Sequence, residues 1–190
     1  MNIIQSPSPN FYTGRKGYNP EMIVVHCTDG YWPSDMEWLR STVAQASAHF
    51  VISPGGEIHQ LVALENGAWH AGRVDHPVVP LKTNTSGVII NPNYYSIGIE
   101  VSLKPPALMT EVQKDALLEL IKSMATQYGI PVDRKHIVGH REIYSLKTCP
   151  GTISVDDLVT KIVTTSSTSP STNNNAAIKA QIVDLLNKIV

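Results

Sequence analysis

The chain has 190 residues, of which 42% are apolar and 16% charged, and its formal net charge at pH 7 is -1. This composition fits one medium-sized domain with a core and something small appended, and the charge argues against a nucleic-acid partner, which would need a basic surface. The two cysteines, Cys27 and Cys149, are too few for a disulfide framework.

The amino-terminal residues 1–9 lack a basic region followed by an apolar core, so they do not read as a Sec signal peptide. No apolar run is long enough to cross a bilayer. We therefore expect synthesis in the cytoplasm and no membrane insertion. The protein would stay in the cytoplasm unless another factor releases it.

The first half of the chain predicts two strand regions and a helix. The β-branched run at residues 22–25 predicts a buried strand that delivers His26 at its carboxyl end. Residues 33–47 carry apolar side chains at helical spacing and predict a helix. Residues 49–52 and 57–61 flank Ser-Pro-Gly-Gly and predict a β-hairpin.

The second half alternates strands with helices. Residues 71–95 are rich in Gly, Pro and Asn and predict a long loop. In a compact domain such a loop usually lines a ligand-binding site. Residues 96–102 alternate as a strand, and residues 110–128 predict a helix that opens with a capping box and is followed by glycine. Residues 136–138 predict a short strand and residues 155–163 a last helix.

The chain divides into three parts. Residues 1–163 are expected to form one domain. Residues 164–177 are rich in Ser, Thr and Asn and predict a linker with nothing to bury. Residues 178–190 predict an amphipathic helix that is too short to be stable alone, so it would dock on the domain or on another chain, as in a homo-oligomer.

The segment at residues 138–151 carries the chemistry, because it places His140, Lys147 and Cys149 within ten residues. Together with His26, it offers two imidazoles and one thiolate, which is a three-ligand zinc site that leaves the fourth position open for water. Lys147 would put a positive charge beside that water and stabilise an oxyanion. The pattern predicts metal-assisted hydrolysis.

Alternation along the strands decides which side chains face this site. His26 and Cys27 point to opposite faces of their strand, so Cys27 is expected in the core as a small apolar residue. Glu100 points away from the apolar residues on either side of it, either as a solvated charge or as a general base for the water. Lys147 likewise reads as either a solvated loop lysine or an oxyanion-stabilising residue.

Four motifs then identify a family resemblance. They are His26 after an apolar strand, Trp69-His70-Ala71-Gly72, Asn93 with Ser96-Ile97-Gly98-Ile99-Glu100, and Gly139-His140 through Lys147-Thr148-Cys149-Pro150-Gly151. In this order they resemble the zinc-dependent N-acetylmuramoyl-L-alanine amidases related to phage lysozyme-type amidases and peptidoglycan recognition proteins. The resemblance spans roughly residues 20–163 and says nothing about the linker or the tail.

The resemblance implies an α/β fold with a central mixed β-sheet flanked by helices, here followed by a short C-terminal helical tail. It implies Zn²⁺ at the floor of a groove that holds a glycan-linked stem peptide. The zinc ligands would be His26, His140 and Cys149, and Lys147 would stabilise the oxyanion.

The general base and the substrate contacts also follow from the resemblance. Some branches of the family place a catalytic tyrosine where this chain has Ala48, and others use the glutamate that is present here as Glu100. The general base is therefore assigned to Glu100. Trp69, His70 and Asn93 would contact the substrate.

These assignments imply hydrolysis of the amide bond between N-acetylmuramic acid and L-alanine in bacterial peptidoglycan, in a phage or prophage endolysin. A cytoplasmic amidase that recycles wall fragments is the alternative setting. In either setting the tail at residues 178–190 is expected to dock, to oligomerise or to begin a wall-binding region. A non-catalytic peptidoglycan-binding module would commonly lack the cysteine ligand. A cysteine hydrolase with Cys149 as nucleophile and His140 as base would leave His26, Lys147 and Glu100 without roles.

Overall fold

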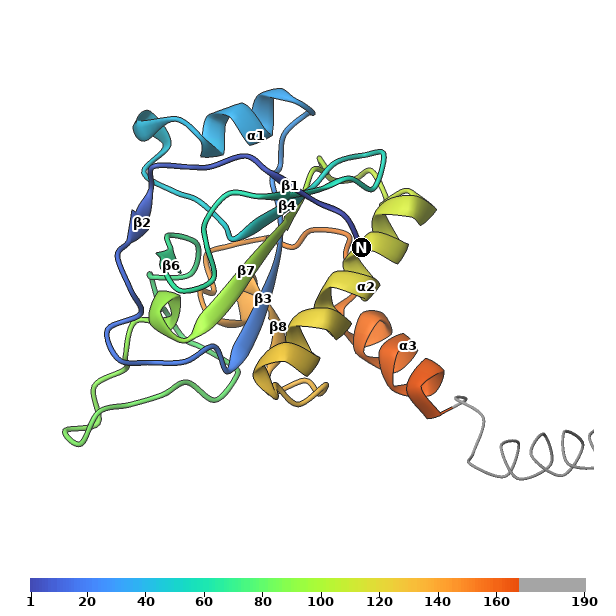
Figure 1. The fold of residues 1–190 in the computed structure, drawn as a ribbon. Helices are drawn as coiled ribbons and strands as arrows, with labels where there is room; N and C mark the ends of the chain where they lie inside the picture. The colour runs from blue at the N-terminus through green and yellow to red at the C-terminus, as the bar shows by residue number, and fades with distance from the viewer. Residues whose placement is uncertain (168–190) are drawn as a thin grey trace, which may run out of the picture.

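A mixed six-stranded β-sheet forms the centre of the molecule in the computed structural model, which describes residues 1–167 (Figure 1). The strand order is β1-β5-β4-β7-β3-β8, and a small antiparallel pair, β2-β6, lies outside this sheet. The strands are β1 (Ile3–Gln5), β2 (Phe11–Tyr12), β3 (Met22–Cys27), β4 (Phe50–Ile52), β5 (Ile58–Gln60), β6 (Gly67–Ala68), β7 (Ser96–Val101) and β8 (Ile137–Gly139).

The four strands β4, β7, β3 and β8 run parallel, so their carboxyl ends meet at one edge of the sheet. In the register of β3 and β7, His26 is paired with Glu100. Paired residues on parallel neighbours point to the same face. The two chemically important side chains are therefore neighbours, although 73 residues separate them along the chain.

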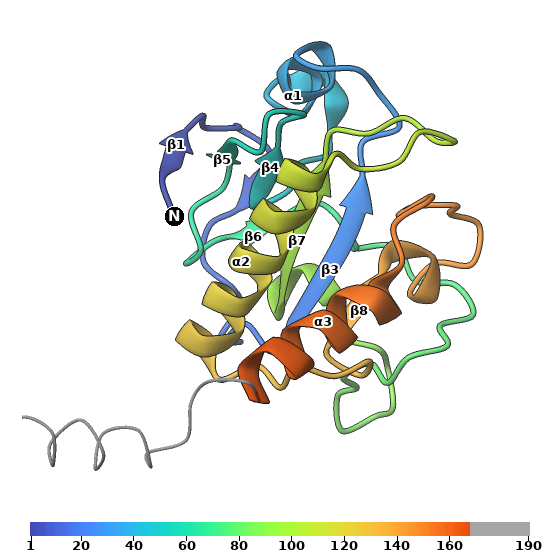
Figure 2. The same ribbon diagram turned by 90° about the vertical axis from the view of Figure 1, so that its right-hand side faces the viewer.

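The two faces of the sheet are different. One face is covered by α2 (Glu111–Tyr128) and α3 (Val155–Ser167), which lie beside each other across the strands (Figure 2). The β3 and β7 side chains that face these helices are in the main core: Ile23, Val25, Cys27, Ile97, Ile99 and Val101. The alternate residues, His26 and Glu100 among them, face the other side.

Several elements confirm the predictions from sequence. The helix α2 begins after Thr110, whose side chain accepts a hydrogen bond from the backbone of Gln113 in a complete capping box, and it ends at Gly129 in the left-handed conformation. The predicted hairpin is the antiparallel pair β4-β5. Cys27 is buried on the core face, as alternation predicted.

The helix predicted over residues 33–47 is wrong in length. The structure has α1 (Ser34–Leu39) and then a separate 3₁₀ turn (Thr42–Ala44). The hydroxyl of Ser41 accepts a hydrogen bond from the backbone of Val43, which starts the new turn, and Gln45 adopts a positive φ of 45° that ends it. Local capping thus overrides the helical spacing of the apolar residues.

The amino-terminal strands β1 and β2 were not predicted. At the other end, α3 continues to Ser167, into the start of the expected linker. The rest of that linker and the expected amphipathic helix, residues 168–190, lie outside the described residues. No helix among the described residues is both long enough and apolar enough to cross a membrane.

Candidate active site

Three potential metal ligands meet at the carboxyl edge of the parallel strands. His26 lies near the end of β3, His140 directly follows β8, and Cys149 lies in the loop between the 3₁₀ turn His140–Glu142 and α3. Their ligand atoms all lie within 4.8 Å of one another. The backbone N–H of Arg141 donates to the carbonyl of Cys149 at 2.9 Å, which closes this loop and brings Cys149 beside His140.

Both histidines are suited to bind a metal because they favour the neutral form. Burial, followed by the charges of His140 and Lys147, holds the pKa of His26 well below its usual value. Burial lowers the pKa of His140 to about 4, and Lys147 adds to the effect. A neutral imidazole has a free lone pair for a cation. Two imidazoles and a thiol are a donor set that fits Zn²⁺.

His70 lies directly behind His26. Its Nδ1 is 3.1 Å from the Nε2 of His26, and its Nε2 is 3.2 Å from the hydroxyl of Ser96. A Cβ atom on Gly98 would come within 2.5 Å of the His70 ring, so this glycine lets the ring lie against β7. His70 borders the groove as expected, yet both of its ring nitrogens are engaged by protein atoms.

Glu100 faces the three ligands from β7. Its Oε1 lies 3.9 Å from the Nδ1 of His26, and its Oε2 is buried and has no hydrogen-bond partner among residues 1–167. Burial raises the pKa of Glu100 to about 8, with smaller contributions from Cys27 and Asp35, while Lys147 opposes the rise. A carboxylate with an unsatisfied oxygen and a raised pKa is suited to accept and return a proton.

Cys149 is a poor nucleophile in this setting. Its Sγ accepts a hydrogen bond from the backbone N–H of Cys27 at 3.3 Å. The neighbouring Cys27 thiol and burial raise the pKa of Cys149 far above its ordinary value. A thiol of this kind ionises when it coordinates a metal, which lowers its pKa directly. The surroundings of Cys149 therefore favour a ligand over a free thiolate.

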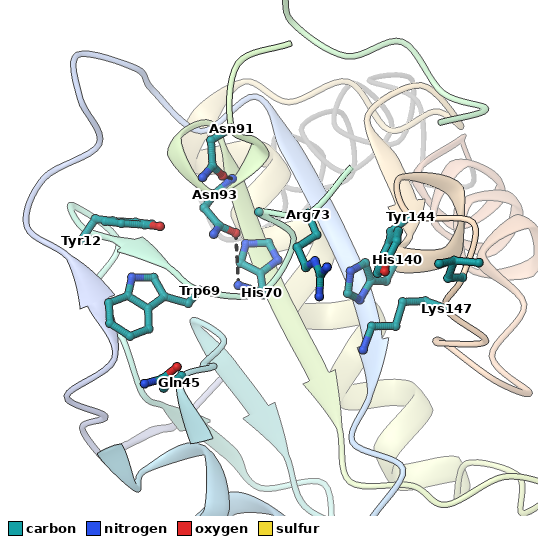
Figure 3. Close-up of a pocket in the computed structure, with 12 residues that line it drawn as sticks. Tyr12, Gln45, Trp69, His70, Arg73, Asn91, Asn93, His140, Tyr144 and Lys147 are labelled. Atoms are coloured by element: carbon teal, nitrogen blue, oxygen red, sulfur yellow. Dashed lines mark hydrogen bonds between the residues drawn. The ribbon is translucent and has the colours of Figure 1, made fainter. Parts of the chain in front are cut away.

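The site opens into two adjoining cavities. One, of about 570 Å³, is lined by the three ligands and Glu100. The other, of about 770 Å³, is lined by His140 but not by His26 or Cys149 (Figure 3). Four residues line both: Trp69, His70, His140 and Lys147. Lys147 is exposed, and its charge acts on His26, His140 and Glu100.

Asn93 also borders the larger cavity, but its oxygen holds the protein backbone. Its Oδ1 accepts hydrogen bonds from the N–H groups of His70 and Ala71 at 3.1 and 2.7 Å. This fixes the segment that carries Trp69 and His70. Sequence reasoning missed Arg73 and Tyr144, which line the same cavity. The only signal was the position of Arg73 directly after the Trp-His-Ala-Gly motif.

A family model and a related sequence both identify the same protein family. Residues 16–152 match the model of the family described as N-acetylmuramoyl-L-alanine amidase. A 79-residue segment is 32% identical to N-acetylmuramoyl-L-alanine amidase A of Achromobacter lyticus. That segment covers 41% of this chain and only 34% of the relative, so about a third of the relative's length is matched.

Solved structures share the fold. A mutant endolysin from Bacillus subtilis is 26% identical with a TM-score of 0.61, and the match covers 85% of this chain and 99% of that one. The amidase AmiD from E. coli, in complex with anhydro-N-acetylmuramic acid-L-Ala-D-γ-Glu-L-Lys, is 24% identical with a TM-score of 0.61. That match covers 74% of this chain and 56% of AmiD.

Proposed function

Because the chain belongs to the N-acetylmuramoyl-L-alanine amidase family, we propose that it hydrolyses the amide bond between N-acetylmuramic acid and the L-alanine of the peptidoglycan stem peptide. The observation that carries this proposal is the pairing of His26 with Glu100 on adjacent parallel strands, with His140 and Cys149 beside them. This arrangement supports the proposal, because a donor set that suits zinc and a carboxylate with one buried oxygen line the same groove.

In this proposal His26, His140 and Cys149 hold Zn²⁺. When bound, the ion would polarise the amide carbonyl and lower the pKa of water toward neutrality. Glu100 accepts the proton from the attacking water and returns it to the departing alanine amine. Lys147 places its ammonium group near the amide oxygen and stabilises the negative charge that develops there.

Substrate positioning is assigned to the walls of the groove. Trp69 lines both cavities and offers an apolar surface, and its buried indole N–H has no hydrogen-bond partner in the described part of the chain. His70 and Asn93 act mainly through the protein, since His70 contacts His26 and the oxygen of Asn93 binds backbone N–H groups. We therefore assign Trp69 to direct substrate contact and the other two to positioning.

The proposal is tested by incubating the protein with purified cell walls. An amidase of this specificity releases new amino-terminal alanine without new reducing sugar. Glu100→Gln serves as the matched control, because it removes the proton acceptor while keeping size and shape. Release of reducing sugar, or release of alanine termini by the Glu100→Gln variant at the wild-type rate, would contradict the proposal.

A cysteine hydrolase is the second chemical candidate, with Cys149 as nucleophile. The raised pKa of Cys149 and its position among His26 and His140 favour the metal-ligand role instead. Chelation and alkylation separate the two. A metal enzyme loses activity to a chelator, and bound zinc shields Cys149 from alkylation. A thiol enzyme resists the chelator and is inactivated by the alkylating reagent.

For the biological setting we propose an endolysin that is made in the cytoplasm and reaches the wall after release. The similarity to the Bacillus subtilis endolysin supports this choice. A muropeptide-recycling amidase is the alternative, and it would prefer soluble fragments to intact walls. Residues 178–190 would dock on the domain, join two copies or begin a wall-binding region. The relative rates on intact walls and soluble muropeptides decide between the two settings.

A further inference from the structure

The groove is asymmetric in charge. The smaller cavity is lined by three carboxylates, those of Asp29, Asp35 and Glu100. The cation of Lys147 borders both cavities, and the larger cavity has that of Arg73 in addition, while none of the described residues that line it is acidic. An anionic part of the substrate is therefore favoured in the larger cavity.

Arg73 is the cation whose role the chemistry of hydrolysis does not explain. Its guanidinium lies over the ring of Tyr144, 5.6 Å from the ring centre, and that ring centre is 6.4 Å from the centre of the His140 ring. No ion pair among the described residues includes Arg73. In Figure 3, Arg73 lies between His70 on one side and His140, Tyr144 and Lys147 on the other.

The segment that carries Arg73 is fixed to the loop that carries Lys147. The carboxylate of Asp75 accepts a hydrogen bond from the hydroxyl of Ser145, and the backbone N–H of Asp75 donates to the carbonyl of Ile143 at 3.2 Å. The backbone next to Arg73 is therefore tied to the loop that carries Lys147, and the exposed Arg73 side chain lies over the Tyr144 ring. A guanidinium over an aromatic face keeps its N–H groups free for a carboxylate.

The stem peptide has a carboxylate close to the scissile bond. In a stem that begins L-Ala-D-γ-Glu, glutamate is linked through its side chain, so its α-carboxylate is free. Alanine, which comes first, has no charged group. The glutamate carboxylate therefore lies about two residues, or roughly 7 Å, beyond the scissile bond. It is the first anionic group on the peptide side.

We propose that Arg73 binds the free α-carboxylate of the γ-linked glutamate and makes the enzyme selective for stems in which that carboxylate is not amidated. The inference rests on the proposed amidase function. Arg73 forms a charge-assisted, two-pronged contact with the carboxylate, and the carboxamide of isoglutamine offers only one acceptor oxygen and no charge. None of the described residues that line this cavity is acidic, so none of them competes with the substrate carboxylate for the Arg73 guanidinium.

The test uses full-length, zinc-loaded protein and two synthetic muropeptides, N-acetylmuramoyl-L-Ala-D-isoglutamate-L-Lys and its isoglutamine counterpart. Wild-type protein should cleave the first with a kcat/KM roughly ten to a hundred times higher, the range expected for a hydrogen bond to a charged group. Arg73→Ala should lose most of this preference, by slowing cleavage of the acid and leaving cleavage of the amide nearly unchanged. Arg73→Lys should keep part of this preference, because lysine retains the positive charge but cannot donate two parallel hydrogen bonds to the carboxylate.

Lys104→Ala is the matched control. The ammonium of Lys104 lies 5.0 Å from the ring centre of Tyr31, so this variant also removes a cation that lies over an aromatic ring. Tyr31, however, lines the smaller cavity and not the larger one. The Lys104→Ala variant should keep the wild-type preference. Zinc content and thermal unfolding of each variant show that the site is intact, and inhibition by L-Ala-D-isoglutamate against L-Ala-D-isoglutamine gives the same comparison without turnover.

Three results separate the possible failures. Equal cleavage of both muropeptides by wild-type protein overturns the role of Arg73 and leaves the amidase function intact. A preference that Arg73→Ala retains assigns the selectivity to another group. Failure of zinc-loaded wild-type protein to cleave either muropeptide overturns the proposed function itself.

Discussion

The Nε2 atom of His26 lies 3.1 Å from the Nδ1 atom of His70, and this contact leaves the Nδ1 of His26 facing Glu100. One buried histidine thus orients another, and Ser96 engages the far nitrogen of His70. Partners behind a metal-binding histidine fix the orientation of its ring and its tautomer. His70 is therefore a positioning residue for His26.

His70→Ala should weaken zinc binding by about 10- to 100-fold, the usual cost of losing such a partner. Competition with a chromophoric chelator measures the affinity directly. His76→Ala is the control, since His76 is a histidine with 87% of its side chain exposed, paired only with Asp75. An unchanged affinity in the His70 variant would assign this residue to substrate contact alone.

Purified protein should contain close to one zinc ion per chain, and chelation should abolish hydrolysis until zinc is returned. Cys149→Ser should lose both metal and turnover, because a neutral hydroxyl is a much poorer ligand than a thiolate. Cys27→Ser should keep its zinc, since the Cys27 side chain packs in the core and is not one of the three ligands, and its backbone N–H, which a serine retains, donates to the Cys149 sulfur. Metal analysis and wall hydrolysis check both variants. Full activity of metal-free protein would exclude the zinc mechanism.

Glu100→Gln should retain zinc but lose about 10²- to 10⁴-fold in rate, because it removes a proton acceptor and no ligand. Kinetics on a soluble muropeptide, with zinc content measured on the same sample, give both quantities. A near wild-type rate in the zinc-loaded variant would move the general base elsewhere in the groove.

The raised pKa of Glu100 also predicts how stability depends on pH in the metal-free protein. Burial raises this pKa from 4.5 to about 8, so the folded state holds the proton more tightly than the unfolded chain. As the pH rises from 4.5 to 8, the wild-type protein should become progressively less stable relative to Glu100→Gln. Above pH 8 the loss in free energy of unfolding should be complete and on the order of a few kcal/mol. Below pH 4.5 the two should be similar. Urea unfolding across this range checks the prediction, and parallel curves would contradict it.

Removal of residues 168–190 should leave zinc binding and cleavage of a small soluble muropeptide unchanged, because the described residues that line the two cavities all lie between residues 12 and 149. Activity on intact walls or the oligomeric state is expected to change. Light scattering and parallel assays on both substrates test this. Loss of small-substrate cleavage by a truncated protein that still folds would show that the tail helps to build the site.

Much of the local structure follows from the sequence. The capping box at Thr110 and the glycine after Tyr128 define α2, because both satisfy backbone groups within a few residues. Local rules were insufficient for α1, where the side chain of Ser41 starts a new turn. The strand β1 was missed because its three residues form a short strand at the edge of the sheet, stabilised by pairing with distant β5.

The sequence by itself determined which side chains leave the core. Strict alternation places His26 opposite Cys27 and Glu100 opposite its apolar neighbours, since the side-chain period of a strand is two residues. Only the tertiary structure decided which of them meet. The parallel register of β3 and β7 sets His26 beside Glu100, and the close approach permitted by Gly98 places His70 behind them. Such contacts depend on backbone pairing between segments far apart in the chain, which no local pattern encodes.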